Sequence, residues 1–160
     1  MTFMYPIEAC GSKTMNLTDS FEKVRQFHIA FNHKCPPSPI LLPEDRVEKR
    51  YKWMLEELEE LRKSNSIHDQ ADAVIDLIYF ALGTLVEMGV NPAPLFEIVH
   101  EANMKKLWPD GKVHYASDGK VIKHPSWRPP ESQLLQEIER QLTSSNGHHV
   151  QGIPDQGRRR

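Results

Sequence analysis

The stretch from Ile67 to Met88, IHDQADAVIDLIYFALGTLVEM, constrains the fold of this chain more than any other segment. It is long enough for about six turns of α-helix. Apolar side chains cover nearly its whole circumference, and a helix that is apolar all round is typically buried in a protein core. The segment therefore predicts a helical protein in which this helix is central and buried.

Three carboxylates nevertheless interrupt this apolar helix. Asp69, Asp72 and Asp76 are spaced i, i+3 and i+7, so they lie along one stripe. A buried carboxylate without a partner costs several kcal/mol, and neighbouring carboxylates repel one another. Two interpretations stay open: ion pairs or a favourable position at the helix start, or a bound divalent cation with the oxygen ligands that Mg²⁺ prefers.

Length and charge narrow the class of protein. A chain of 160 residues with a net charge of −2 predicts one domain and shows no basic surface for nucleic acid. The two cysteines, Cys10 and Cys35, form no disulfide framework, and a reduced setting suits them. The N-terminus lacks the features of a signal peptide, and no apolar run is long enough to cross a membrane. We expect a soluble, cytoplasmic protein without a nucleic-acid or membrane partner.

The remaining elements follow from apolar periodicity and from turn residues. Besides residues 67–88, helices are predicted over about 19–32, 44–63, 92–107 and 131–142, and a proline-rich connector over 34–43. Two Asp-Gly turns predict a small β-hairpin that pairs residues 112–115 with 120–123. The predicted fold is all-α: a four-helix bundle with a β-hairpin appendage and a peripheral C-terminal helix. The predicted divisions are an irregular segment over 1–18, a domain over 19–130, and a final helix with a disordered tail over 131–160.

A second acidic stripe lies on the preceding helix, at Glu56, Glu57 and Glu60. Taken alone, such a stripe is commonly a solvated helix face. Helices joined by a short loop tend to pack antiparallel, however, so Glu57 and Glu60 can face Asp72 and Asp76. Four converging carboxylates suit Mg²⁺ or Mn²⁺, and metals of this kind bind phosphate substrates. The side chains of Asn103, Lys105 and Lys106 are then candidate contacts to a phosphate or a base.

Residues 56–61 (EELEEL), followed by residues 72–79 (DAVIDLIY), resemble the all-α nucleoside triphosphate pyrophosphohydrolase superfamily of MazG-like enzymes. Residues 24–31 (VRQFHIAF), residues 103–106 (NMKK), two Asp-Gly-Lys turns and Trp127-x-Pro-Pro extend the likeness to its phosphoribosyl-ATP pyrophosphohydrolase-like, Cof-like subgroup. The resemblance covers roughly residues 19–130. It implies a MazG-like bundle and Mg²⁺-dependent hydrolysis of nucleoside triphosphates between the α- and β-phosphates, which yields a nucleoside monophosphate and pyrophosphate.

The resemblance also implies roles for individual carboxylates. Glu57 and Glu60 match metal ligands, and Glu56 matches either a further ligand or the group that orients the attacking water, so Glu56 and Glu57 are the candidate catalytic residues. Asp76 matches the aspartate of the second motif. Ala73 stands where the superfamily usually has a glutamate. Asp72 then supplies the fourth ligand, with Asp69 as the alternative.

Substrate contacts and assembly complete what the resemblance implies. Asn103 and Lys106 match a nucleotide-contacting Asn-x-x-Lys, with Lys105 beside them, and Trp53 either stacks on the base or packs as a structural aromatic. A homodimer or homotetramer is implied. Two alternatives to the triphosphate hydrolase stay open: a non-catalytic helical module for oligomerisation or nucleotide binding, and an enzyme acting on phosphoribosyl-ATP.

Overall fold

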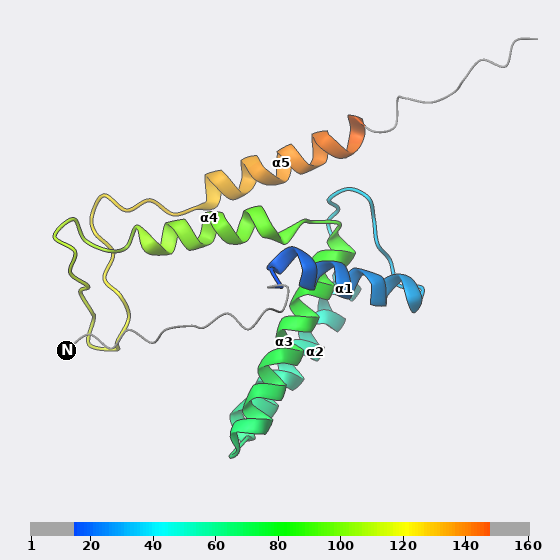
Figure 1. Ribbon diagram of the computed structural model, residues 1–160, viewed down its shortest axis with the longest axis horizontal. Coiled ribbons are helices and arrows are strands. Elements are labelled where there is room, and N and C mark those ends of the chain that lie inside the picture. The colour runs from blue at the N-terminus through cyan, green and yellow to red at the C-terminus, as the bar shows by residue number, and fades with distance from the viewer. Residues whose placement is uncertain (1–14, 148–160) are drawn as a thin grey trace, which may run out of the picture.

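The computed structural model describes residues 15–147, and these residues form an all-α structure, as predicted. The helices α2 and α3 lie side by side as a long antiparallel pair, α1 crosses them, and α4 runs alongside α5 (Figure 1). The helices in chain order are α1 (Leu17–Ala30), α2 (Glu44–Lys63), α3 (Ile67–Met88), α4 (Pro92–Met104) and α5 (Glu131–Gly147).

Local capping signals explain where the central helix begins and ends. The Ser66 hydroxyl accepts a hydrogen bond from Asp69 N at 3.1 Å, which caps the N-terminus of α3. Gly89 ends α3 in the left-handed conformation, with φ of 65°. Asn91 then caps α4, whose first residue is Pro92. These ends agree with the turn and cap residues of the sequence.

The hydrophobic core lies where α1 crosses the C-terminal half of α3. Val24, Leu82 and Val86 are buried there. Leu17, Phe21 and Cys35 pack around them as partly buried neighbours. The proline-rich connector closes this end, because Ile40 N donates to the Met88 carbonyl at 2.8 Å.

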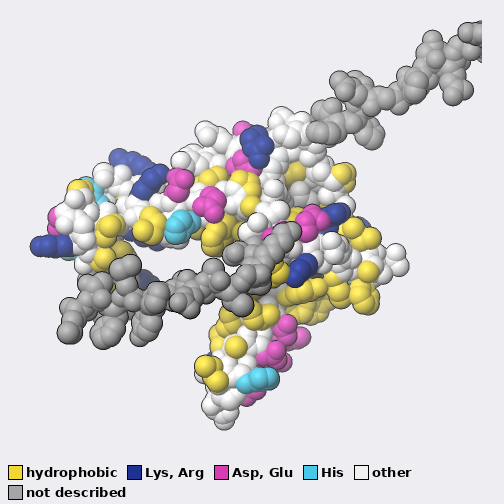
Figure 2. Space-filling view, in the orientation of Figure 1, with side chains coloured by type: hydrophobic (Ala, Val, Ile, Leu, Met, Phe, Trp, Pro, Cys, Tyr) yellow, Lys and Arg dark blue, Asp and Glu magenta, His cyan; other side chains and the backbone are white. Residues whose placement is uncertain are grey.

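The N-terminal half of α3 is not buried within this chain, so the prediction of a wholly buried helix is wrong for the single chain. Ile75 is 61% exposed and Ile78 48% exposed. On α2, Tyr51 is 54% exposed and Leu58 46% exposed. Apolar side chains show along the free part of the α2–α3 pair (Figure 2). The reason is that α1 packs on the C-terminal half of α3, at Leu82 and Val86, whereas along the rest of α3 only one side is covered, by α2.

The fourth helix leaves the α2–α3 pair instead of closing a compact bundle over it. It contacts α1 and α5. Buried Gln141 joins α5 to the N-terminus of α4. Its side chain accepts a hydrogen bond from Asn91 N at 2.9 Å and donates one to Asn91 O at 3.1 Å. The last helix continues to Gly147, past its predicted end, and hydroxyls such as Thr143 and Ser145 bond back to its carbonyls.

The predicted β-hairpin is wrong, since the described residues contain no strand. One isolated antiparallel bridge joins Tyr115 and Val121. The Ile122 carbonyl, which a longer ladder would pair with His114 N, instead accepts the Trp108 indole N–H at 3.1 Å. Trp108 also packs against His114, with ring centroids 4.1 Å apart. A side chain thus takes the place of the next ladder bond.

Some predictions fall outside what the structure describes. The irregular character of residues 1–14, the disorder of residues 148–160 and any pairing of Cys10 lie outside the described residues. Cys35 has a free thiol and is half-buried. Within residues 15–147, no helix combines the length and the hydropathy that a membrane crossing requires.

Candidate active site

The two acidic stripes lie on α2 and α3, and Glu57 is the carboxylate on which their charges act together. This side chain is half-buried. Burial raises the pKa of Glu57, and the nearby charges of Glu60, Asp76, Glu56 and Asp72 raise it further. Two of these neighbours come from α2 and two from α3. The antiparallel pairing therefore brings the stripes together into one acidic face, which we define by these five residues.

A shallow hollow of about 320 Å³ continues the acidic face at the α2–α3 turn, and Glu60, Asp69 and Asp72 line it. Asp69 already has hydrogen-bond partners close to it in the sequence, Ser66 and His68, and these hydrogen bonds lower the pKa of its carboxyl group. Its position in the first turn of α3 also suits the helix dipole. Asp72 has no such local bond holding its carboxylate and lies one turn from Asp76.

Ala73, at the position where the superfamily pattern has a glutamate, is 3% exposed. The side chain lies inside the packing of α3, where a glutamate carboxylate would be desolvated. Asp72, its neighbour, is exposed on the acidic face.

The acidic face suits a hard divalent cation by the chemistry of its donors. All five side chains offer carboxylate oxygens, the ligands of Mg²⁺. Burial and, after it, the neighbouring carboxylates raise the pKa of Glu57, and a cation would relieve the repulsion between these carboxylates. Among residues 15–147, no three His, Cys, Asp or Glu side chains already converge at ligand distance on one point. The donor types therefore fit the metal, and rotation of exposed side chains would be needed to enclose it.

Trp53 lies in a pocket of about 390 Å³ that adjoins the acidic face. It stacks on Phe80, with ring centroids 5.9 Å apart. The guanidinium carbons of Arg46 and Arg50 lie 4.9 and 5.2 Å from the centre of its ring. Trp53 is one helical turn from Glu57 on α2, and Phe80 is one turn from Asp76 on α3. An aromatic and cationic pocket thus borders the carboxylates.

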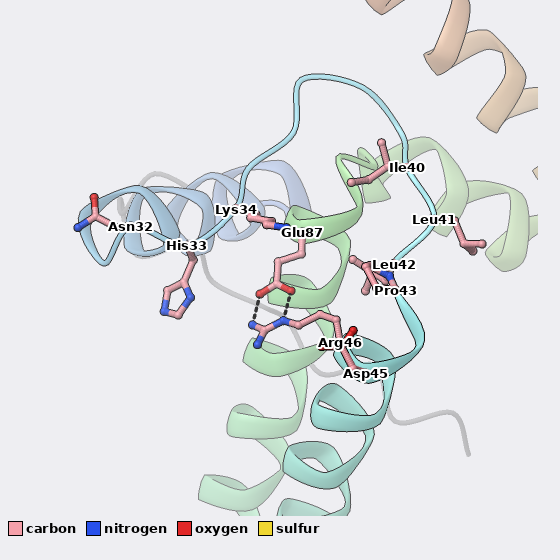
Figure 3. Close-up of a pocket in the computed structure, with 10 residues that line it drawn as sticks. All are labelled: Asn32, His33, Lys34, Ile40, Leu41, Leu42, Pro43, Asp45, Arg46 and Glu87. Carbon is pink, nitrogen blue, oxygen red and sulfur yellow. Dashed lines mark hydrogen bonds and ion pairs between the residues drawn. The ribbon is translucent and has the colours of Figure 1, made fainter.

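A second cavity, of about 420 Å³, lies between the proline-rich connector and the start of α2 (Figure 3). Arg46 and Glu87 lie at its inner side and form an ion pair there, with Arg46 Nε donating to Glu87 at 2.6 Å. This cavity holds none of the site residues predicted from the sequence.

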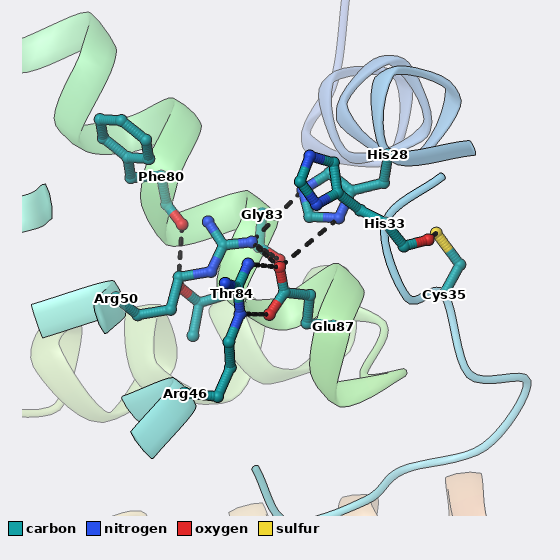
Figure 4. Close-up of polar contacts among 9 residues, drawn as sticks. All are labelled: His28, His33, Cys35, Arg46, Arg50, Phe80, Gly83, Thr84 and Glu87. Atoms are coloured by element: carbon teal, nitrogen blue, oxygen red, sulfur yellow. Dashed lines mark hydrogen bonds and ion pairs between the residues drawn. The ribbon is translucent and has the colours of Figure 1, made fainter. Parts of the chain in front are cut away.

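The ion pair belongs to a charge cluster that was not predicted from the sequence, formed by the buried residues His28, Arg50 and Glu87 and by partly buried Arg46 (Figure 4). Glu87 is 3% exposed and accepts hydrogen bonds from both arginines. Burial would raise the pKa of Glu87, but the hydrogen bonds and charges of Arg46 and Arg50 outweigh burial and lower it to about 2. A glutamate within the apolar end of α3, with two arginines four residues apart on α2, was the available signal.

The absence of a side chain at Gly83 leaves space for the side chains of this charge cluster. Its carbonyl accepts from Arg50 Nη2 at 3.2 Å. A Cβ at this position would lie 3.0 Å from His28 Nε2 and 3.1 Å from Arg50 Nη1. His28, Arg46 and Arg50 of this cluster also line the Trp53 pocket, so the two features are continuous.

The predicted nucleotide contacts at the end of α4 are not brought to the acidic face within one chain. The α4 end and the acidic part of the α2–α3 pair lie at separate ends of the molecule (Figure 1). Lys106 Nζ donates to Asn103 Oδ1 at 2.6 Å, and Lys105 pairs with Glu101 at 3.5 Å. In this chain, Asn103, Lys105 and Lys106 therefore form a separate group.

Comparisons with known proteins identify a matching family and a similar solved structure. The family model for phosphoribosyl-ATP pyrophosphohydrolase matches residues 24–103, which is 80 of the 160 residues. A solved structure that matches is a candidate NTP pyrophosphohydrolase from Exiguobacterium sp. 255-15. It is 35% identical, the match covers 79% of this chain and 97% of that chain, and the TM-score is 0.46. No protein with a curated description matches the chain.

Proposed function

Because this chain belongs to the phosphoribosyl-ATP pyrophosphohydrolase family, we propose that it is a nucleotide pyrophosphohydrolase with its active site on the acidic face. The reaction cleaves a nucleoside triphosphate between the α- and β-phosphates. Water adds to phosphorus, the bridging P–O bond breaks, and a nucleoside monophosphate and pyrophosphate leave. The observation that carries the proposal is the crowding of four carboxylates from two helices around Glu57.

The carboxylates take the roles that the family pattern implies. Glu57, Glu60, Asp72 and Asp76 would hold Mg²⁺, with Mn²⁺ as a substitute of similar ligand preference. Asp72 is preferred to Asp69 because Asp69 is bonded to Ser66 and His68 at the helix start. When bound, the metal polarises phosphoryl oxygens and activates water.

The chain's own groups then position the reactants. Glu56 and Glu57 orient the attacking water, Glu57 from its place as a ligand. Trp53 borders the carboxylates and offers an aromatic surface to the base, although Phe80 and the two arginines already pack against it. Asn103, Lys105 and Lys106 are proposed to contact the nucleotide. They lie at the end of α4, which is apart from the free end of the α2–α3 pair of the same chain (Figure 1).

The apolar surface of the α2–α3 pair supports assembly into a homodimer or homotetramer. Tyr51, Leu58, Ile75 and Ile78 are each between 46% and 61% exposed. An apolar face of this kind on a helix pair usually marks an interface. A second copy of the chain would cover it, and the same contact could bring one chain's α4 end towards the acidic face of another.

Ultracentrifugation tests this assembly. Wild type should sediment as a dimer or tetramer, and Ile78→Glu and Tyr51→Glu should shift it towards monomer. Lys49→Glu, an exposed charge change on α2, is the matched control and should leave the mass unchanged. A monomeric wild type at micromolar concentration would contradict the assembly.

The activity test is a panel of ribo- and deoxynucleoside triphosphates with Mg²⁺, Mn²⁺ or EDTA, with pyrophosphate and orthophosphate measured separately. Wild type should release pyrophosphate only with metal. Asp76→Asn should lower the rate at least about 100-fold, since loss of a ligand costs more than loss of the groups that orient one. Asp45→Asn, an exposed substitution on α2, should keep full activity. Equal rates in Asp76→Asn and wild type would overturn the site.

Two other functions are each favoured by one observation. The description of the matching family model favours phosphoribosyl-ATP as substrate, and adding this compound to the panel tests it by competition. The burial of Ala73 at the position of a usual metal ligand favours a non-catalytic module for oligomerisation or nucleotide binding. That module would show no metal-dependent turnover with any member of the panel.

A further inference from the structure

The cavity of about 420 Å³ between the proline-rich connector and the start of α2 lies outside the proposed active site (Figure 3). We call it the connector cavity and define it by Asn32, Lys34 and Arg46 on its polar side and by Ile40 and Leu42 on its apolar side. Its volume lies in the range of pockets that hold small molecules. The connector cavity is therefore large enough for a small organic ligand.

Backbone hydrogen bonds and prolines hold the walls of the connector cavity in place. On one side, Asn32 adopts a φ of 56°, and its N–H donates to Ile29 O at 3.1 Å to close the turn after α1. On the other side, Ile40 N donates to Met88 O at 2.8 Å. The connector over 34–43 contains four prolines, which restrict its backbone. The cavity is thus formed before any ligand enters it.

Two cationic side chains of the cavity have donors that the protein does not use. Arg46 donates to Glu87 through Nε at 2.6 Å and through Nη2 at 2.5 Å, whereas its Nη1 has no acceptor among the described residues (Figure 3). Lys34 is exposed, and its Nζ forms no ion pair or hydrogen bond within residues 15–147. A guanidinium and an ammonium with unused N–H groups suit an anionic oxygen ligand.

The charges around the cavity favour an anion with a single negative charge. Glu87 accepts hydrogen bonds from both Arg46 and Arg50, so two arginines share one carboxylate. The other charged residues of the lining are Lys34 and Asp45. With the histidines neutral, these five residues carry one uncompensated positive charge. A monoanion neutralises it, whereas a dianion or a nucleotide would add negative charge beside two carboxylates.

The apolar side of the cavity indicates the rest of the ligand. Ile40, Leu42 and Pro43 line it, and Ile40 is 44% exposed. A ligand that covers these side chains would remove apolar surface from water. This wall is aliphatic, and it suits a short aliphatic chain.

We propose that the connector cavity binds a small aliphatic monocarboxylate. The carboxylate accepts hydrogen bonds from Lys34 Nζ and Arg46 Nη1, and the chain packs on Ile40 and Leu42. Arg46 also lines the Trp53 pocket, and its guanidinium carbon lies 4.9 Å from the centre of the Trp53 ring. Binding in the connector cavity therefore reaches the Trp53 pocket through this one shared side chain.

The test is an NMR titration of the isotope-labelled full-length protein with 4-methylpentanoate at pH 7, in EDTA and without nucleotide. Amide signals of residues 32–46 and the Trp53 indole signal should shift, with a dissociation constant in the millimolar range or tighter. 4-Methylpentanol keeps the chain and lacks the charge, so it should bind at least about tenfold more weakly. Pentanedioate, a dianion, should also bind more weakly than 4-methylpentanoate.

Variants of the lining separate the two parts of the contact. Lys34→Gln should weaken binding of 4-methylpentanoate at least about tenfold, because it removes a hydrogen bond to a charged group. Lys34→Arg keeps the charge and should stay within about threefold of wild type. Ile40→Ser should weaken binding at least about threefold through the loss of apolar contact. Lys49→Gln, an exposed change on α2 outside the cavity, is the matched control and should bind as wild type does.

Three results would overturn the proposal. One is an affinity that is unchanged in Lys34→Gln, and another is 4-methylpentanol binding as tightly as 4-methylpentanoate. The third is the absence of shifts in residues 32–46 at about 10 mM ligand, including the case in which only the exposed apolar residues of α2 and α3 respond. Because the titration uses neither metal nor nucleotide, its outcome is independent of the hydrolysis test.

Discussion

Substitution of Glu87 by glutamine should destabilise the protein more than any other single change to a charged side chain described above. Glu87 is 3% exposed, and Arg50, its partner, is 4% exposed. Arg46 donates to it through Nε at 2.6 Å and Nη2 at 2.5 Å, and Arg50 donates through Nη2. Glutamine keeps the shape of the side chain but leaves two guanidinium groups without their counter-charge in a desolvated site.

The magnitude follows from the titration of the carboxyl group. The two arginines lower the pKa of Glu87 from 4.5 to about 2, which corresponds to about 3 kcal/mol of interaction in the folded state. Removing one partner from a buried ion pair costs about 3–5 kcal/mol in other proteins. We therefore expect Glu87→Gln to lower the free energy of unfolding by about 3 kcal/mol at pH 7.

The pH dependence gives a second, independent readout. Because the folded-state pKa lies below the unfolded-state value of 4.5, the stability that Glu87 contributes is fully present above pH 4.5. It is lost as the pH falls from 4.5 towards 2. The difference in stability between wild type and Glu87→Gln should therefore shrink over this range.

Urea unfolding at a fixed protein concentration measures both effects. With a typical m-value, a loss of about 3 kcal/mol moves the midpoint by about 1–3 M urea. Glu97→Gln, an exposed change on α4, should stay within about 0.5 kcal/mol of wild type. A loss below about 1 kcal/mol for Glu87→Gln at pH 7 would refute the reasoning.

Three further predictions concern a turn, a histidine and the metal. Gly89→Ala should cost at least about 2 kcal/mol in urea unfolding, because φ is 65° and a Cβ would lie 2.8 Å from Pro36 O; an unchanged midpoint would contradict this. Burial and the charge of Arg50 lower the pKa of His28 below 6.5, so stability should fall as the pH drops below 6.5, and His28→Gln should flatten this dependence. Mg²⁺ should raise the Tm of wild type, EDTA should reverse the rise, and Asp76→Asn should show none.

Local chemistry explains why the helices could be predicted closely. Ser66 caps α3, Gly89 ends it, and Asn91 with Pro92 begins α4. Each signal acts within a few residues, so it works in any tertiary setting. The hairpin failed for the opposite reason, since Trp108 takes the Ile122 carbonyl from fourteen residues away in sequence.

The candidate site was predictable to the same extent. The stripes on α2 and α3 follow from helical spacing, and the short turn between the helices brings them together. The buried cluster around Glu87 was not predicted, because a charged residue in an apolar run does not reveal which distant residue will pair with it. The contacts of Lys123 and Lys106 with the Trp127 ring were not predicted for a similar reason, since only the fold brings these three side chains together.

The sequence by itself determined the helices, both ends of α2 and α3, the first residue of α4 and the two rows of carboxylates, because these depend on contacts between near neighbours in the chain. Tertiary structure alone decided what covers each apolar face. The same apolar periodicity runs along the whole of α3, but Val86 is buried against α1 whereas Ile75 stays exposed within this chain. Periodicity identifies a face that must leave water, but only packing decides whether another helix of the chain or another molecule covers it.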